Sequence, residues 1–238
     1  MEDIPIGLLV ASIGFALGII FGATAQSTNF CTMGAISDII FIGNWNRFRA
    51  WILSISIAVL LSQLMHFNSV INLNNSIYLS PNFSWVGAII GGLMFGFGMT
   101  LAGGCGNRIL VRIGAGNLKS LITFIFLGLF AYMTLRGLLG PLRQEFELLT
   151  VVDLKQSGLK SQSIFEVLGI IINIREGLAE VLIASTISVL LIIFCMTSRS
   201  FRSSHKDLSA GLIIGILIAL GWFTTGVIGK DEFDPTPL

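Results

Sequence analysis

The chain has 238 residues, of which 54% are hydrophobic and 11% charged, and it contains 27 glycines and 18 phenylalanines. Soluble domains carry roughly a quarter charged residues, and a chain of this size cannot hide so much apolar surface in one water-soluble core. We therefore predict an integral membrane protein. A net charge of +1 gives no support for nucleic-acid binding. Three cysteines without a CxxC pair or a Cys/His cluster argue against a disulfide framework and a metal site, and we expect no cofactor.

The apolar stretches predict six membrane-spanning helices, since each span needs about 20 predominantly apolar residues. They lie at about residues 6–25, 50–66, 85–103, 117–135, 177–197 and 210–229. The acidic start Met1-Glu2-Asp3 argues against a cleaved signal peptide, so the first span is expected to be retained. The predicted fold class is all-α.

Two shorter apolar pieces, residues 32–45 and 104–116, do not fit this span count. The first is too short to cross a bilayer, and the second is broken by glycines and carries Arg108 and Arg112. Non-helical backbone at membrane depth is tolerated only where protein buries it or where it lines a watery cavity. Both pieces are therefore predicted to be re-entrant segments with half-helices.

The pattern divides the chain into three parts. Residues 1–136 form a first membrane repeat with two cysteine motifs, residues 137–176 a polar connection with an amphipathic LRQEFELL piece, and residues 177–238 two further helices and a tail. The bias of basic residues in short loops predicts the orientation, with both termini outside. The face predicted to be cytoplasmic holds Arg47, Arg49, Arg108, Arg112, Lys119, Arg199, Arg202 and Lys206.

An internal repeat ends in cysteine. In two spans a Gly-xxx-Gly pair is followed nine residues later by a cysteine, and a third span has a threonine at the matching distance. Small residues at this spacing let another helix approach closely, and packing alone would explain any single pair. The shared distance to cysteine favours a functional reading. The positions are Gly18, Gly22 and Cys31; Gly92, Gly96 and Cys105; and, as a degenerate copy, Gly211, Gly215 and Thr224.

Each cysteine stands where one helix is predicted to end and a short one to begin. A helix N-terminus offers unpaired N–H groups and about half a positive charge to an anion. A thiol is polarizable and a weak donor and acceptor, which suits a sulfur-bearing anion. The predicted path residues are Cys31, Cys105, Gly34, Gly104, Gly106, Asn29, Asn107 and Thr32, with Arg108 and Arg112 as an electrostatic mouth.

Structural alternatives stand beside these roles. The two arginines could snorkel to headgroups and set only topology. The Asn side chains, with Thr28, Thr32 and Thr100, could either contact a substrate or satisfy broken backbone. Asp38 is a functional candidate as an intramembrane charge, but it could simply pair with Arg47 or Arg49. Cys195 lies in an unbroken apolar helix, where we expect packing.

The segments NFCTMGAISDIIFIGNWNRFRAW and GFGMTLAGGCGNRILVRIGAGNLKSL resemble the YeeE/YedE family of membrane sulfur-compound transporters, whose best understood members take up thiosulfate. The resemblance covers most of the chain and implies a pseudo-symmetric, multi-pass helical protein of the bacterial inner membrane. It also implies that thiosulfate or a similar small inorganic sulfur anion moves along a Cys-lined path. By position, Cys31 and Cys105 match the first-half cysteines of that path. A small cytoplasmic sulfurtransferase of the TusA type is implied as a partner.

Full-length relatives of that family continue past a segment like GKDEFDPTPL into a second half with its own Gly-Cys motif. We expect either a truncated or split product or a second polypeptide that supplies this half. Thr224 is a hypothetical element that closes the path. Two other functions stay open: a membrane thiol-redox protein that uses Cys31 and Cys105, and a non-transporting subunit of a split transporter.

Overall fold

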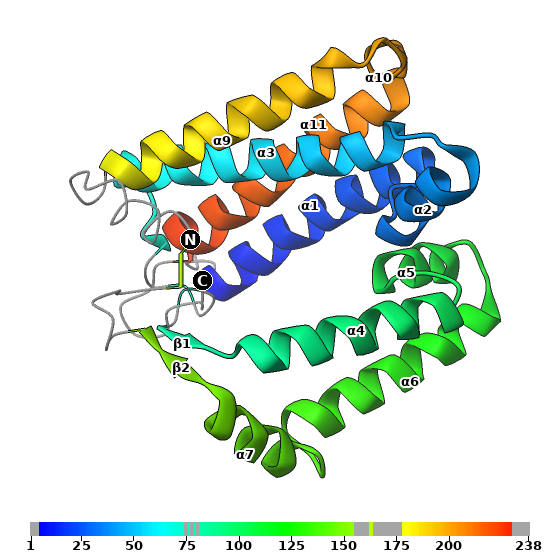
Figure 1. The fold of residues 1–238 in the computed structure, drawn as a ribbon, viewed down its shortest axis with the longest axis vertical. Helices are drawn as coiled ribbons and strands as arrows, with labels where there is room; N and C mark the ends of the chain where they lie inside the picture. The colour runs from blue at the N-terminus through cyan, green and yellow to red at the C-terminus, as the bar shows by residue number, and fades with distance from the viewer. Residues whose placement is uncertain are drawn as a thin grey trace.

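The computed structural model describes residues 5–73, 76, 79, 81–154, 162–163 and 178–229. Helices dominate this part of the chain, as Figure 1 shows. In chain order the elements are α1 (Ile6–Thr28), α2 (Thr32–Ser37), the π-helical turn η1 (Asp38–Ile42), α3 (Asn46–Phe67), β1 (Asn82–Phe83), α4 (Trp85–Leu101), α5 (Gly106–Gly114), α6 (Leu118–Leu135), α7 (Gly140–Thr150), β2 (Val152–Asp153), α9 (Leu178–Thr197), α10 (Arg199–Ser203), α11 (His205–Phe223) and the π-helical turn η5 (Thr224–Ile228).

The predicted all-α membrane class is confirmed. Among the described residues, five helical segments are long and apolar enough to cross a bilayer, and they run over Ile6–Ile42, Asn46–Phe67, Trp85–Gly114, Leu118–Leu135 and His205–Ile228. The remaining predicted span corresponds to α9, whose apolar part Val181–Thr197 is shorter than the other five. The segments predicted to be re-entrant contain the separate short helices α2 and α5, and their depth in a membrane stays a prediction.

Helices α1, α3, α9 and α11 form one group, in which α3 packs against both α9 and α11, and α11 also contacts α1. Helices α4 and α6 lie in a second layer, with α5 beside the C-terminal end of α1 (Figure 1). Buried residues from α1, α3, α9, α10 and α11 share one core, which includes Leu53, Cys195, Phe201 and Ile214. This first group is therefore the scaffold from which the N-terminal cysteine segment is held.

The glycine pairs of the repeat behave differently from one another. A Cβ at Gly211 would lie 2.9 Å from the Ala50 carbonyl oxygen, and one at Gly215 would lie 2.8 Å from the Ser54 carbonyl oxygen, so α11 packs closely on α3. At the other two pairs, Gly18 with Gly22 and Gly92 with Gly96, no atom lies within 4 Å of such a Cβ. Close helix packing, which the spacing allowed at all three pairs, is thus confined within the described residues to the degenerate copy.

The polar connection begins with α7, which covers the amphipathic piece and carries an Arg143 to Glu147 ion pair of 2.8 Å. Strand β2 then pairs antiparallel with β1, with Asn82 opposite Asp153. Residues 155–161 and 164–176 of the predicted connection lie outside the described residues, and its interfacial position stays a prediction.

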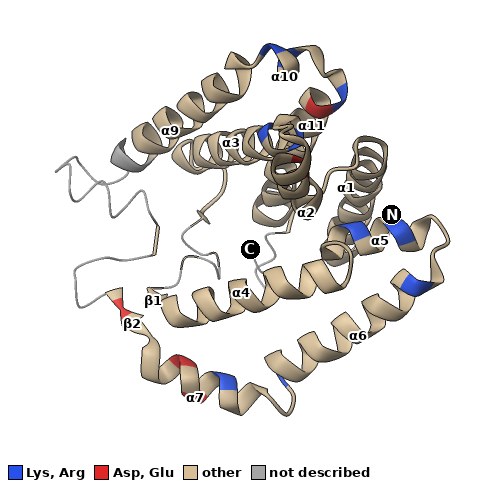
Figure 2. Ribbon diagram, turned by 45° about the vertical axis from the view of Figure 1, so that its right-hand side comes forward, with Lys and Arg blue, Asp and Glu red and all other residues tan. Residues whose placement is uncertain are grey.

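Basic residues gather at one end of the molecule. Figure 2 shows Lys and Arg on α5, on α10 and at the start of α6, whereas α7 at the other end carries both acidic and basic residues. The predicted orientation rests on the basic residues of the short loops. The cysteine segments lie at the basic end, next to α2 and α5 (Figures 1 and 2).

Candidate functional site: a thiol pair between two short helices

The structure brings Cys31 and Cys105 together, although they are 74 residues apart in sequence. Their Sγ atoms lie 3.7 Å from each other. Both are free thiols, and the two residues are only 2% and 8% exposed. Cys31 is the residue before α2, and Cys105 is the residue before α5, both in extended backbone conformation. We call these two side chains the thiol pair.

The two copies of the sequence repeat also share a backbone conformation just before their cysteines. Two residues before each cysteine, the chain takes the left-handed conformation, at Asn29 with φ 55° and at Gly103 with φ 68°. The next residue donates back across the turn, from Phe30 N–H to the Ala25 carbonyl and from Gly104 N–H to the Met99 carbonyl. Gly and Asn are the residues that tolerate this conformation, and the bonding is that of a helix C-terminal Schellman motif. We call residues 29–31 and 103–105 the two cysteine loops.

Backbone N–H groups at the start of both short helices lie near the two sulfur atoms. Those of Gly34 and Cys105 lie near the Cys31 sulfur, and those of Arg108 and Thr32 near the Cys105 sulfur. Neither thiol makes a cap hydrogen bond to its own helix. N–H dipoles at helix starts favour negative charge nearby.

Several predicted path residues are occupied with the protein itself. The Asn107 side-chain amide donates to the Phe30 carbonyl at 3.3 Å and so joins α5 to the first cysteine loop. The hydroxyls of Thr28 and Thr100 donate to carbonyls of their own helices, those of Thr24 and Phe97. For these three residues the backbone-satisfying reading accounts for the contacts. Thr32 reaches the thiol pair only through its backbone N–H.

The predicted glycines have different neighbours. A Cβ at Gly34 would lie 3.0 Å from Nη1 of Arg47, and one at Gly104 would lie 3.3 Å from Cβ of Arg108. At Gly106 no atom lies within 4 Å of such a Cβ. The first two glycines are thus covered by arginine side chains, while Gly106 leaves open space beside Cys105.

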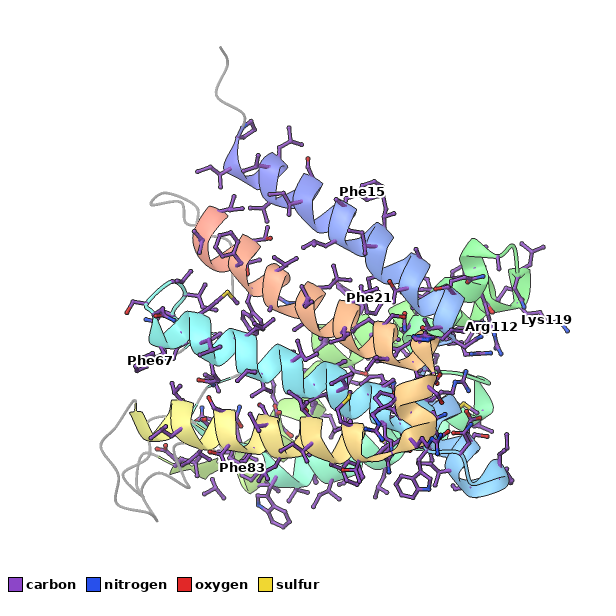
Figure 3. All side chains as sticks on the ribbon, turned by 90° about the horizontal axis from the view of Figure 1, so that it is seen from above. Phe15, Phe21, Phe67, Phe83, Arg112 and Lys119 are labelled. Carbon is purple, nitrogen blue, oxygen red and sulfur yellow. The ribbon has the colours of Figure 1, made fainter. Side chains whose placement is uncertain are left out.

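Beside the first cysteine loop lies a cavity of about 150 Å³. Arg108 and Arg112, four residues apart on α5, face Gln26 and Asn29 across it. A groove of about 580 Å³ continues along α1 and α5 and shares Gln26 with the cavity, and its lining includes Gly18 and Gly22. Figure 3 shows Arg112 beside the C-terminal end of α1, with Lys119 farther out at the same end.

The sequence argument missed Gln26 because a single polar residue near the end of an apolar helix carries no pattern of its own. The sequence did contain one signal for the groove. A stripe of small residues leaves space along a helix face when no other helix packs against it. The glycine pair of α1 therefore lines a groove in the described structure.

The remaining candidates are accounted for by structural contacts. Asp38 pairs with Arg47 at 3.0 Å. Cys195 is fully buried, as its apolar helix predicted, and its thiol donates to the Arg49 carbonyl at 3.3 Å. Thr224 is buried, and its hydroxyl donates to the Leu220 carbonyl, one turn earlier in α11, at 2.8 Å.

The chain is similar to known proteins over most of its length. A family model described as sulphur transport matches residues 27–233. The thiosulfate transporter TsuA of Spirochaeta thermophila is 26% identical over 223 residues, which cover 91% of this chain and 64% of that protein. The thiosulfate transporter TsuA of Escherichia coli is 30% identical over 126 residues, covering 53% of this chain and 33% of that protein.

The probable transporter YedE of Escherichia coli is 31% identical over 101 residues, covering 42% of this chain and 23% of that protein. The chain thus spans 64% of the length of the Spirochaeta relative and smaller shares of the other two.

Proposed function

The chain belongs to the sulphur transport family, and from this premise we propose that it carries thiosulfate or a similar small sulfur-containing anion across a membrane. Two of its relatives are named thiosulfate transporters. We place it among transporters, not enzymes. The bilayer is its environment, and the inner membrane of a bacterial cell is the location proposed for it.

The thiol pair is the observation that carries this proposal. Two sulfur atoms 3.7 Å apart offer a soft, polarizable contact to the outer sulfur of thiosulfate. The nearby backbone N–H groups of Gly34, Thr32 and Arg108 would favour the negative charge of the anion. Oxygen-only anions of the same charge would gain less from the thiols, so the pair supports selectivity for sulfur.

The cavity beside the first cysteine loop is the proposed electrostatic mouth. Arg108 and Arg112 line it together with Gln26 and Asn29, and its volume of about 150 Å³ is suited to a small anion with little water. Cationic side chains in a confined space raise the local concentration of an anion. In the predicted orientation this mouth faces the cytoplasm, where a TusA-like sulfurtransferase would receive the sulfur compound.

The direct test is uptake of labelled thiosulfate into vesicles that contain the full chain. Cys31→Ala and Cys105→Ala each remove one soft contact, and we expect both to lose most of the uptake. Cys195→Ala is the matched control, because that thiol bonds to the Arg49 carbonyl and takes no part in the pair. Full uptake by Cys105→Ala would contradict the assigned role.

The same assay distinguishes the alternatives. If uptake occurs only when a second membrane polypeptide of this family is supplied, the chain is one subunit of a split transporter. Thiol redox chemistry is a second candidate, favoured by the short distance between the two sulfurs. It requires a Cys31 to Cys105 disulfide under mild oxidation and a function that depends on it. Transport instead requires both thiols to be reduced.

A further inference from the structure

We infer that Arg47 and Arg112 are matched positioning residues that fix the distance between the two thiols. Each guanidinium binds the carbonyl of the left-handed residue two positions before a cysteine. The inference rests on the proposed function only where it says that this distance serves the binding of a sulfur-containing anion. It also gives the two arginines of the predicted mouth different roles. Arg112 binds a carbonyl of the protein, whereas Arg108 is available to bind the anion.

Arg47 holds both ends of the segment that carries Cys31. Its Nη2 donates to the Asn29 carbonyl at 2.9 Å, and its Nη1 donates to Asp38 at 3.0 Å. The guanidinium lies over Gly34, where a Cβ would stand 3.0 Å from Nη1. Gly34 lies in the first turn of α2, which begins directly after Cys31, so Arg47 packs against the turn that follows the thiol.

Arg112 makes the equivalent contact in the second cysteine loop. Its Nη1 donates to the Gly103 carbonyl at 3.0 Å. Gly103 stands two residues before Cys105, as Asn29 stands two residues before Cys31. The two arginines come from different helices, α3 and α5, and they do not occupy equivalent positions of the repeat. Two arginines from unrelated parts of the sequence therefore make the same contact, to the carbonyl two residues before a cysteine.

The physical reason lies in the helix ends. The carbonyls of Asn29 and Gly103 lie just past the C-terminal ends of α1 and α4, where the negative end of each helix dipole lies. A guanidinium there provides a hydrogen-bond donor and a positive charge that interacts favourably with the helix end. Because the guanidinium is planar with several fixed donors, Arg47 can bind two groups at once, which a lysine ammonium does less well.

Arg108 differs from both. Within the described residues its guanidinium forms no hydrogen bond or ion pair, although it acts electrostatically on Cys31 and lines the cavity. A substitution at Arg108 should thus change anion binding without moving the thiols. A substitution at Arg47 or Arg112 should move the thiols first.

The test measures thiol proximity without relying on transport. The full chain with Cys195→Ala is treated in membranes with dibromobimane, which becomes strongly fluorescent when it bridges two thiols. We expect Arg47→Lys and Arg112→Lys to slow bridging about tenfold, the size expected for loss of a charge-assisted hydrogen bond that is partly screened. Arg199→Lys, at an exposed residue of the same end, is the charge-preserving control.

Bridging at the parent rate in both lysine variants would overturn the inference, and so would equal slowing in Arg199→Lys. If Arg47→Lys does not fold, Asp38→Asn keeps the shape of the partner and should slow bridging less. Bridging at the parent rate in Asp38→Asn and in Arg112→Lys would then overturn the inference. Uptake is measured in parallel. Slowed bridging with unchanged uptake supports the positioning role and contradicts the proposed path, so the two failures are distinguishable.

Discussion

Substitution of Gly215 by alanine should separate α11 from α3. The added Cβ would lie 2.8 Å from Cβ of Ile57 and 2.8 Å from the Ser54 carbonyl oxygen. Carbon atoms in good contact are about 3.5–4.0 Å apart, so the helices must move apart by about 0.7 Å or more. Overpacking of this kind costs about 1–3 kcal/mol, whereas alanine gains up to about 1 kcal/mol over glycine in a helix interior. We expect the free energy of unfolding to fall by about 1–2 kcal/mol.

The assay is thermal unfolding in a mild detergent, where this loss corresponds to a Tm lower by about 2–8 °C. Gly14→Ala is the matched control, because no atom lies within 4 Å of a Cβ at that position of α1. It should leave the Tm unchanged or raise it. The same Tm change in both variants would refute the packing argument, and with it the conclusion that α11 packs closely on α3 at Gly215.

Other predictions concern the site. Gly34→Ala should push the Arg47 guanidinium off its contacts and lower thiosulfate uptake several-fold, while the circular dichroism spectrum stays unchanged; unaltered uptake would show that Cys31 does not depend on this contact. Arg108→Gln should raise the thiosulfate concentration for half-maximal uptake about tenfold, because one charged donor is lost from the cavity, and an unchanged value would exclude Arg108 from the mouth. Thr224→Val should leave uptake unchanged, since its hydroxyl bonds to the Leu220 carbonyl, and a large loss would restore its role in closing the path.

Much of the fold follows from apolar length alone, because a bilayer sets the number of residues that a helix needs. The helices found at Ile6–Thr28, Asn46–Phe67 and Leu118–Leu135 agree with stretches chosen on that basis. The repeat predicted that Cys31 and Cys105 belong to one path, because both copies end in the same residue at the same distance from a glycine pair. It did not predict that the two Sγ atoms lie 3.7 Å apart, since that distance depends on how the two loops pack.

Pairwise contacts were not predictable in the same way. Sequence spacing cannot tell whether a Gly-xxx-Gly pair packs, as Gly215 does, or lines a groove, as Gly22 does, since the answer depends on the neighbouring helix. The Arg47 and Arg112 contacts join positions with no shared periodicity. Gln26 lines the cavity because of how α1 is rotated about its axis. A uniformly apolar sequence does not show which face of the helix points toward the cavity.

The central claim is that a sulfur anion contacts both thiols of the pair at once. The most direct measurement is anomalous diffraction from crystals of the protein soaked with selenosulfate, in which selenium replaces the outer sulfur of thiosulfate. We expect a selenium peak in contact with Sγ of both Cys31 and Cys105, and loss of that peak in Cys105→Ala. A peak bound elsewhere, with no selenium at the thiol pair, would contradict the account.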